Sequence, residues 1–256
     1  MMIELNKIYN EDCEVTMSKM DDNFVDIIMT SPPYNMTKRK GGNADTGRYD
    51  VYMDWLSEED YISNTIKVFN EFNRIVKKNG VVLYNFSYSI ENPSLPYKLV
   101  RDITAFTEWT LADTIIWKKT CGLPFPANER RLSRNWEFVW VFVRNKEINT
   151  FNCNKGVKSV SKKTGQKYFN VFYNFVEAKN NDAKTTKLNQ ATYSSELCEK
   201  LFDIYGMDGY VVYDPYIGTG TTAIACKNKN MFYIGSEISL DQCKYANERI
   251  MAIKDY

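Results

Sequence analysis

The sequence contains three short stretches whose residue types and spacing could support chemistry. The first is Thr30-Ser31-Pro32-Pro33-Tyr34-Asn35, which follows a predominantly apolar run over residues 25–29. Two consecutive prolines end any regular element and hold the backbone in an extended form. The loop would therefore present a hydroxyl, unpaired carbonyls and an aromatic ring at the end of a strand. The tetrapeptide alone fits a simple turn or a proline-rich ligand equally well.

The second stretch is the glycine-rich segment Asp214-Pro215-Tyr216-Ile217-Gly218-Thr219-Gly220-Thr221-Thr222, between a predicted strand over residues 210–213 and a predicted helix. Glycines allow backbone amides to approach a ligand at a helix N-terminus. The third is Glu237, which follows a predicted strand over residues 231–234, about 20 residues past Gly218, where it could accept hydrogen bonds from ribose hydroxyls. This order of strand, loop, helix, strand and acid is typical of half of a nucleotide-binding fold.

Several readings of the glycine segment compete. A P-loop is excluded because no Gly-Lys-Ser/Thr follows the glycines. The spacing from Gly218 to Ala223 satisfies the dinucleotide fingerprint, so NAD(P) remains a rival, as does a tight turn that binds nothing. Asp214 would repel a pyrophosphate but attract the ammonium of an amino-acid moiety. S-adenosylmethionine has that ammonium, a ribose for Glu237 and no phosphate, so the combination favours this methyl donor.

The composition excludes several other classes of chemistry. The 256 residues include no histidine, which rules out Ser-His-Asp and Cys-His catalysis and histidine-ligated zinc. The six cysteines are scattered without a Cys-x-x-Cys pair, so we expect free thiols and no metal. No apolar run is long enough to span a bilayer and the start lacks a signal pattern, so we expect an intracellular protein that is neither secreted nor membrane-bound.

Charge is distributed unevenly along the chain. The net charge is +1, but residues 118–167 contain 12 Lys/Arg and three Glu. Aromatic residues are interleaved with lysines and asparagines farther on, over residues 168–175. A basic and aromatic segment on an acidic body favours a nucleic-acid partner. A solvated charged face with a small satellite core would explain the pattern equally well.

The predicted elements place these stretches on one rim of a sheet. We expect strands over residues 3–9, 25–29, 81–86, 113–117, 138–143, 210–213 and 231–234, and helices over 14–20, 57–78, 196–205 and 239–254. Residues 37–52 have no apolar period and predict a mobile surface loop beside the site. Only one strand follows the glycine segment, so the N-terminal half must complete the sheet and bring the Ser-Pro-Pro-Tyr loop to the cofactor. No linker divides the chain, which predicts one α/β domain over residues 1–256.

With these motifs in this order, the chain resembles the β class of DNA amino-methyltransferases, which modify the exocyclic nitrogen of adenine or cytosine. The resemblance rests on the Ser-Pro-Pro-Tyr loop, the glycine segment and Tyr233-Ile-Gly-Ser-Glu237. It implies a Rossmann-like methyltransferase sheet with helices on both faces, a circularly permuted motif order and a small basic target-recognition insertion within about residues 118–187. It also implies S-adenosylmethionine as cofactor and double-stranded DNA as partner, and it leaves a homodimer open.

The resemblance gives catalytic roles to Ser31, Pro32, Pro33 and Tyr34. The Ser31 hydroxyl and the Pro32 carbonyl would accept hydrogen bonds from the exocyclic amine, and Tyr34 would stack on a base flipped from the duplex. The methyl group would then be transferred in line. Serine at the first motif position favours N4 of cytosine, with N6 of adenine as the alternative. No Pro-Cys dipeptide occurs, so cytosine C5 methylation is excluded.

The cofactor-binding residues that the resemblance implies are Asp12, Cys13, Asn189, Thr192, Asp214, Tyr216, Gly218, Gly220, Thr221, Thr222 and Glu237. Asp12 would hold the adenine amino group, although a role as N-cap of the next helix explains it equally well. The chain departs from the family at Asn189-Gln190, where His-Pro is usual, and at Ser194, where proline is usual.

We expect DNA contacts from Lys38, Arg39, Lys40, Arg130, Arg131 and Arg134, which could read guanine edges or hold phosphates. Two alternatives of other classes remain. One is an NAD(P)-dependent oxidoreductase, and the other is an inactive, DNA-binding relative of the methyltransferases.

Overall fold

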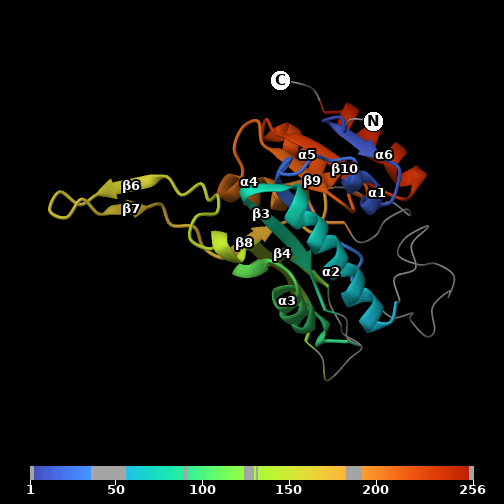
Figure 1. Ribbon diagram of the computed structural model, residues 1–256, viewed down its shortest axis with the longest axis horizontal. Coiled ribbons are helices and arrows are strands. Elements are labelled where there is room, and N and C mark those ends of the chain that lie inside the picture. The colour runs from blue at the N-terminus through green and yellow to red at the C-terminus, as the bar shows by residue number, and fades with distance from the viewer. Residues whose placement is uncertain are drawn as a thin grey trace.

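The computed structural model describes residues 3–35, 56–88, 92–123, 130, 132–182 and 192–253. Within these residues, the chain forms an eight-stranded sheet with helices on both faces and a separate two-stranded hairpin. The hairpin extends away from the sheet and its helices (Figure 1). The expected α/β sheet with helices on both faces is therefore confirmed.

The strand order of the sheet is β1-β10-β9-β2-β3-β5-β4-β8. These strands are β1 (Lys7–Tyr9), β2 (Val25–Thr30), β3 (Val76–Phe86), β4 (Trp109–Leu123), β5 (Arg134–Arg144), β8 (Phe175–Ala178), β9 (Val211–Asp214) and β10 (Phe232–Ser236). Neighbouring strands are parallel except that β5 runs antiparallel to β3 and to β4. Strand β2 lies between β9 and β3, so an N-terminal strand does complete the sheet beside the C-terminal glycine segment.

The central strands are buried on both faces, as parallel strands usually are. Every residue of β2 is buried, and successive side chains enter opposite cores. Ile28 packs on the side of helices α1 (Cys13–Ser18), α2 (Glu58–Ile75) and α3 (Leu95–Phe106). Ile27 and Met29 pack on the side of α4 (Ser195–Tyr205), α5 (Thr221–Asn228) and α6 (Leu240–Met251). The two faces thus hold separate hydrophobic cores.

The helix predicted over residues 57–78 is shorter than expected, because α2 ends at Ile75. Val76 already has an extended backbone and pairs with Val25, so β3 begins two residues before the predicted helix end. At Gly80, an added Cβ would lie 2.7 Å from the Asp26 carbonyl oxygen, and only glycine avoids this contact. The pairing of β3 with β2 therefore overrides the local helical pattern.

Several elements were not predicted from the sequence. Helix α3 buries Leu95, Leu99 and Ile103 at intervals of one helical turn. The hairpin consists of β6 (Val157–Val160) and β7 (Lys167–Phe169), all of whose residues are exposed. A short 3-10 helix, η1 (Asn145–Glu147), follows β5. Among the described helices, none has the length and apolar content needed to cross a membrane.

Candidate active site

Four neighbouring parallel strands end in polar residues that the sequence singled out. In the sheet order β1, β10, β9 and β2, their carboxyl ends carry Asp12, Glu237, Asp214 and Ser31. The Thr30 hydroxyl donates a hydrogen bond of 2.8 Å to Asp214 Oδ1 and so ties the ends of β2 and β9 together. The predicted cofactor and catalytic stretches therefore lie on the same rim, where ligands bind in open α/β sheets.

Asp214 is fully buried and accepts hydrogen bonds from its own chain. Besides Thr30, the donors are the Thr222 hydroxyl at 2.6 Å, the Tyr193 hydroxyl at 2.9 Å and the Tyr216 amide at 3.1 Å. Burial raises the pKa of the carboxyl, and these hydrogen bonds oppose the rise. Asp214 thus anchors the loop that covers it. Its contact with a ligand ammonium remains a prediction. Tyr193 was missed because its hydroxyl reaches Asp214 only in the folded chain.

Gly218 and Gly220 shape the loop between β9 and α5. Their φ angles are +53° and +83°, in the left-handed region that favours glycine. An added Cβ at Gly220 would lie 2.9 Å from Ala246 Cβ in α6. The Gly218 amide donates to Glu237 Oε2 at 3.0 Å, and the Gly220 amide donates to the Ile217 carbonyl at 2.9 Å. Both glycine amides therefore form hydrogen bonds within the chain. The approach of this loop to a ligand remains a prediction.

Glu237 is a half-buried carboxylate held at the end of β10. In addition to the Gly218 amide, the Ser239 amide donates to Oε1 at 2.8 Å. The side chain of Asn10, just beyond β1, donates to the Glu237 carbonyl at 2.9 Å. These contacts join the segments that follow β1, β9 and β10, and they hold the carboxylate in one orientation. A fixed, partly exposed carboxylate is a suitable acceptor for vicinal hydroxyls.

Asp12 and Cys13 open helix α1 at the far end of the rim. Asp12 is exposed, and its side chain accepts the Glu14 amide at 2.8 Å, which confirms its role as N-cap. Its contact with an adenine remains a prediction. Cys13 is buried, and burial raises the pKa of its thiol to about 12. The thiol therefore stays neutral and is unsuited to act as a nucleophile.

The remaining cofactor candidates lie at the loop or just before α4. Arg249 of α6, which the sequence did not single out, donates to the Thr219 carbonyl at 2.6 Å and pairs with Asp182 at 3.0 Å. Thr221 and Thr222 are buried in the first turn of α5, and Thr192 is half-buried. Asn189 lies outside the described residues. Ser194 stands where the family usually has proline. Its side chain caps α4 by accepting a hydrogen bond from the Leu197 amide, which gives serine a structural role at this position.

The Ser-Pro-Pro-Tyr loop enters a polar network built by β3, β4 and β5. The Tyr34 hydroxyl lies 2.9 Å from Ser31 Oγ, 2.9 Å from Asn85 Oδ1 and 3.1 Å from Glu137 Oε2. Lys119 Nζ lies 2.5 Å from the other carboxylate oxygen of Glu137. Asn85, Glu137 and Lys119 were missed, although Asn85 is a polar residue at the end of an apolar strand. A polar residue at the end of a buried strand is the sequence feature that could have identified Asn85 as a site residue.

The chemistry of these partners fixes the direction of the hydrogen bonds. The Asn85 side-chain nitrogen donates to the Phe138 carbonyl at 2.8 Å, so its oxygen faces Tyr34. This oxygen and the Glu137 carboxylate can only accept, so the single proton of the Tyr34 hydroxyl is directed to one or the other of them. Ser31 must then donate its proton to Tyr34. The remaining lone pairs of Ser31 Oγ are acceptors for a further group.

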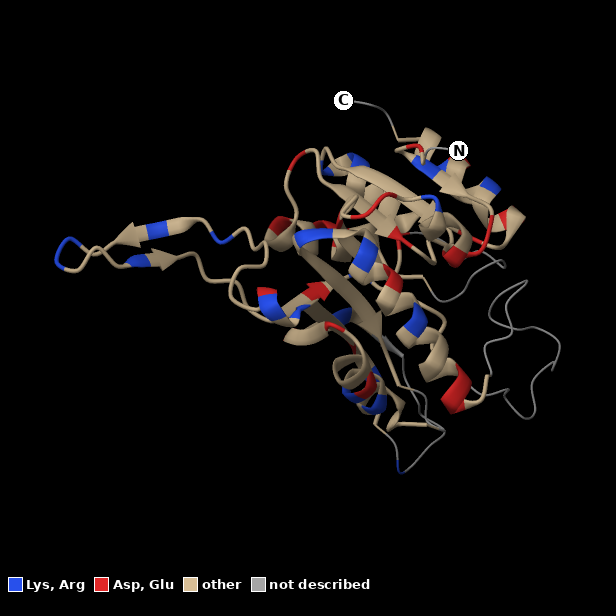
Figure 2. Ribbon diagram, in the orientation of Figure 1, with Lys and Arg blue, Asp and Glu red and all other residues tan. Residues whose placement is uncertain are grey.

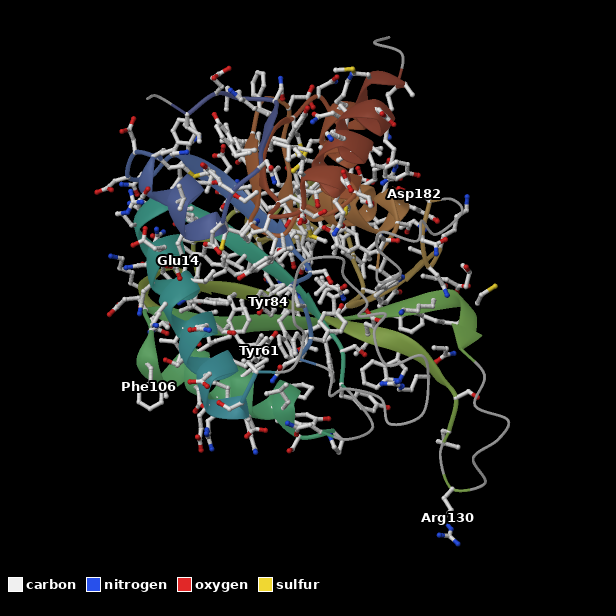
Figure 3. The ribbon with its side chains drawn as sticks, turned by 90° about the vertical axis from the view of Figure 1, so that its right-hand side faces the viewer. Glu14, Tyr61, Tyr84, Phe106, Arg130 and Asp182 are labelled. Carbon is white, nitrogen blue, oxygen red and sulfur yellow. The ribbon has the colours of Figure 1, made fainter. Side chains whose placement is uncertain are left out.

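The two proline carbonyls of the loop differ. The Pro33 carbonyl accepts the Tyr61 hydroxyl at 2.5 Å, and Tyr61 points from α2 toward the sheet (Figure 3). Among the described residues, none donates a hydrogen bond to the Pro32 carbonyl. The Tyr34 ring packs against Phe86 with ring centroids 4.8 Å apart. The loop thus combines a rigid backbone with two acceptors, Ser31 Oγ and the Pro32 carbonyl.

The predicted DNA-contact residues are only partly described. Arg134 donates to the Tyr88 carbonyl, and its guanidinium carbon lies 5.1 Å from the centroid of the Tyr88 ring. Arg130 is exposed and lies beyond the end of β4, away from the sheet (Figure 3). Lys38, Arg39, Lys40 and Arg131 lie outside the described residues. Among the described residues, no group of three or more His, Cys, Asp or Glu could hold a metal ion.

A mixed, mostly parallel sheet with a glycine loop after β9, a carboxylate after β10 and a Ser-Pro-Pro-Tyr loop after β2 defines a Rossmann-like methyltransferase. The sequence matches the DNA methylase family of N6 and N4 methyltransferases over residues 25–248. The chain belongs to this family, whose cofactor is S-adenosylmethionine. This membership decides against an NAD(P)-dependent oxidoreductase.

Relatives and solved structures agree with the assignment. The Type II methyltransferase M.BglII of Bacillus subtilis is 26% identical over 253 residues, covering 91% of this chain and 66% of the relative. The orphan methyltransferase M.BamHII of Bacillus amyloliquefaciens is 27% identical, covering 88% of each chain. The structure of PvuII DNA methyltransferase (cytosine-N4-specific) has a TM-score of 0.73 at 16% identity, covering 99% of this chain and 90% of that one. The M1.HpyAVI–SAM complex has a TM-score of 0.60 at 20% identity, covering 95% and 97%.

Proposed function

We propose that this protein methylates the exocyclic amine of a base flipped out of double-stranded DNA, with N4 of cytosine as the favoured target and N6 of adenine as the alternative. The observation that carries the proposal is the pair of acceptors in the rigid loop after β2. Ser31 Oγ is oriented as an acceptor by its donation to Tyr34, and the Pro32 carbonyl has no donor among the described residues. An aromatic amine offers two N–H groups, and these two acceptors match them.

The residues along the rim would bind the parts of S-adenosylmethionine in order. Asp12 would take the adenine amino group, Glu237 the ribose hydroxyls and the glycine loop before α5 the methionine. Because neighbouring strands are about 4.8 Å apart, the three steps from β1 to β2 span about 14 Å. This length suits an extended nucleoside joined to an amino acid. The bound cofactor would supply an electrophilic methyl group beside Ser31.

The loop would activate the amine by geometry. The nitrogen lone pair of an aromatic amine is delocalised into the ring, which makes it a poor nucleophile. Hydrogen bonds to Ser31 Oγ and the Pro32 carbonyl would draw the nitrogen toward tetrahedral geometry and localise the lone pair. Proline fixes the direction of the carbonyl, and Tyr34 provides an aromatic surface for the flipped base. Proximity and orientation would then provide much of the rate.

The hairpin β6–β7 would provide the DNA contact within the recognition region over residues 118–187. Residues 148–176 contain five lysines and no acidic residue. Blue bands without red mark this arm, in contrast to the mixed charges of the body (Figure 2). The exposed side chains include Tyr168 and Phe169 as well as the lysines. A two-stranded ribbon fits the major groove, which is about 12 Å wide, and lysines would displace counterions from the phosphates.

The test of the enzyme is incubation with unmethylated DNA and S-adenosylmethionine, followed by nucleoside digestion and mass spectrometry. We expect N4-methylcytosine, and N6-methyladenine would select the alternative target. The Ser31→Ala variant should lose turnover while it retains affinity for the cofactor. DNA retention without any methylated nucleoside would instead support the inactive DNA-binding relative.

The test of the hairpin is the salt dependence of DNA binding. Replacement of Lys158 and Lys167 by alanine should weaken binding and lower the slope of log K against log salt concentration by about 1 to 2, since each phosphate contact contributes nearly one. The matched control replaces Lys67 and Lys78, which are exposed on α2 and β3. Equal slopes for the two double variants would contradict the assignment.

A further inference from the structure

We propose that Glu137 receives the proton that the target amine loses on methylation, by way of Ser31 and Tyr34. This inference rests on the proposed function. When the nitrogen of a neutral amine forms a bond to a methyl group, it becomes positively charged and must lose one proton. Ser31 touches that nitrogen in the proposed complex but is too weakly basic to keep the proton. A carboxylate must therefore be within reach of the relay.

Hydrogen bonds that start at Ser31 lead to such a carboxylate. Ser31 Oγ is 2.9 Å from the Tyr34 hydroxyl, which is 3.1 Å from Glu137 Oε2. Both steps are within the range of ordinary O–H to O hydrogen bonds or slightly longer. The residues come from the loop after β2 and from β5, which are joined through β3 in the sheet. The connection is therefore part of the packed fold.

The orientation of the network already matches the direction of proton movement. Ser31 donates to Tyr34, and the single Tyr34 proton is shared between Glu137 and Asn85, both of which only accept. As the N–H bond breaks, an O–H bond forms at Ser31 Oγ, and the original Ser31 proton moves to Tyr34. The Tyr34 proton moves to Glu137 Oε2 in turn. The positive charge lost at the sulfonium is thus matched by the negative charge lost at Glu137, so the step leaves no net charge behind.

Lys119 positions the acceptor carboxylate of Glu137. Lys119 Nζ binds Glu137 Oε1 at 2.5 Å and lies 4.8 Å from the centroid of the Trp117 ring. The side chains of Glu137 and Lys119 are 13% and 15% exposed, so the carboxylate is held in place yet can later release a proton to solvent. Asn85 cannot return a proton to Tyr34, since its amide nitrogen is occupied by the Phe138 carbonyl. Because Lys119 occupies Oε1, Glu137 Oε2 is the oxygen that would receive the proton from Tyr34.

The experiment measures single-turnover methylation of unmethylated DNA by Glu137→Gln, Tyr34→Phe and the double variant, together with the dissociation constants for S-adenosylmethionine and for DNA. Loss of a general acid–base path reduces rates by about 100-fold or more. We expect each single variant to lose about this factor while both dissociation constants stay within about twofold of wild type. The double variant should be no slower than the slower single variant, because both changes break one path. Glu137→Asp, which retains the carboxylate, should recover part of the rate.

The matched control is Glu58→Gln. Glu58 also binds a lysine at 2.5 Å, Lys98, but lies on α2 outside the rim. It should methylate at the wild-type rate. Three results would each overturn the proton path without affecting the proposed function. They are a wild-type rate for Glu137→Gln, a rate loss in the double variant equal to the product of the two single losses, and a loss of DNA affinity as large as the loss of rate. Failure of the wild-type protein to methylate any amine would instead overturn the proposed function itself.

Discussion

Replacement of Gly220 by alanine should destabilise the protein through two separable effects. The φ angle of Gly220 is +83°, and a residue with a Cβ pays about 1–2 kcal/mol in the left-handed region. The new Cβ would also lie 2.9 Å from Ala246 Cβ and 3.3 Å from its Cα, which forces α5 and α6 apart. Overpacking of this kind costs about 1–3 kcal/mol. We therefore expect the free energy of unfolding to fall by about 2–5 kcal/mol, a large part of the stability of a typical domain.

Gly209→Ala is the matched control, since Gly209 has a φ angle of +78° and an added Cβ would meet no atom within 4 Å. Urea unfolding should show a loss of only about 1–2 kcal/mol for this variant, and the difference between the two variants measures the contact with Ala246. Binding of S-adenosylmethionine, measured by calorimetry on the folded proteins, should weaken for Gly220→Ala alone, because only that change displaces the loop that holds Glu237. Equal unfolding energies for the two variants would refute the reasoning.

Three further predictions concern buried polar groups. Tyr193→Phe removes a hydroxyl that donates to Asp214 at 2.9 Å, and urea unfolding should show a loss of about 1–3 kcal/mol; an unchanged midpoint would mean that Asp214 does not need this donor. Glu147→Gln leaves Arg144 buried without its partner at 3.2 Å, where the two side chains are 5% and 7% exposed, and should cost about 3–5 kcal/mol in the same assay. Smaller losses would show that the other acceptors of Arg144 suffice. Burial raises the pKa of Asp214 above its ordinary value in the folded chain. The contribution of protonated Asp214 to the free energy of unfolding is therefore fully present below the unfolded-state pKa, and it is lost as pH rises through the folded-state pKa. Wild type should thus gain stability relative to Asp214→Asn as pH falls, and a gain with rising pH would contradict the sign.

The sequence alone determined the features that depend on short stretches of chain. Local backbone preferences predicted the rigid loop at residues 30–35, the glycine loop before α5 and, as one of two roles for Asp12, the N-cap of α1. The glycine segment, Asp214 and the acid after the next strand together predicted the methyl donor. The same local logic failed at residues 76–78, where pairing of β3 with β2 converts a predicted helical turn into strand.

Tertiary structure alone decided which polar groups meet. Thr30 and Asp214 are 184 positions apart, and Tyr34 and Glu137 are 103 positions apart, yet each pair is hydrogen-bonded. The register of β4 against β5 places Lys119 beside Glu137, and no periodicity in the sequence specifies that register. Buried polar atoms must find partners wherever the sheet order brings them, because an unsatisfied group in the core is costly. For this reason the sequence could place a carboxylate at the rim, whereas only the fold could show that Asp214 accepts hydrogen bonds from Thr30 and Thr222 and that Glu137 lies beside Tyr34.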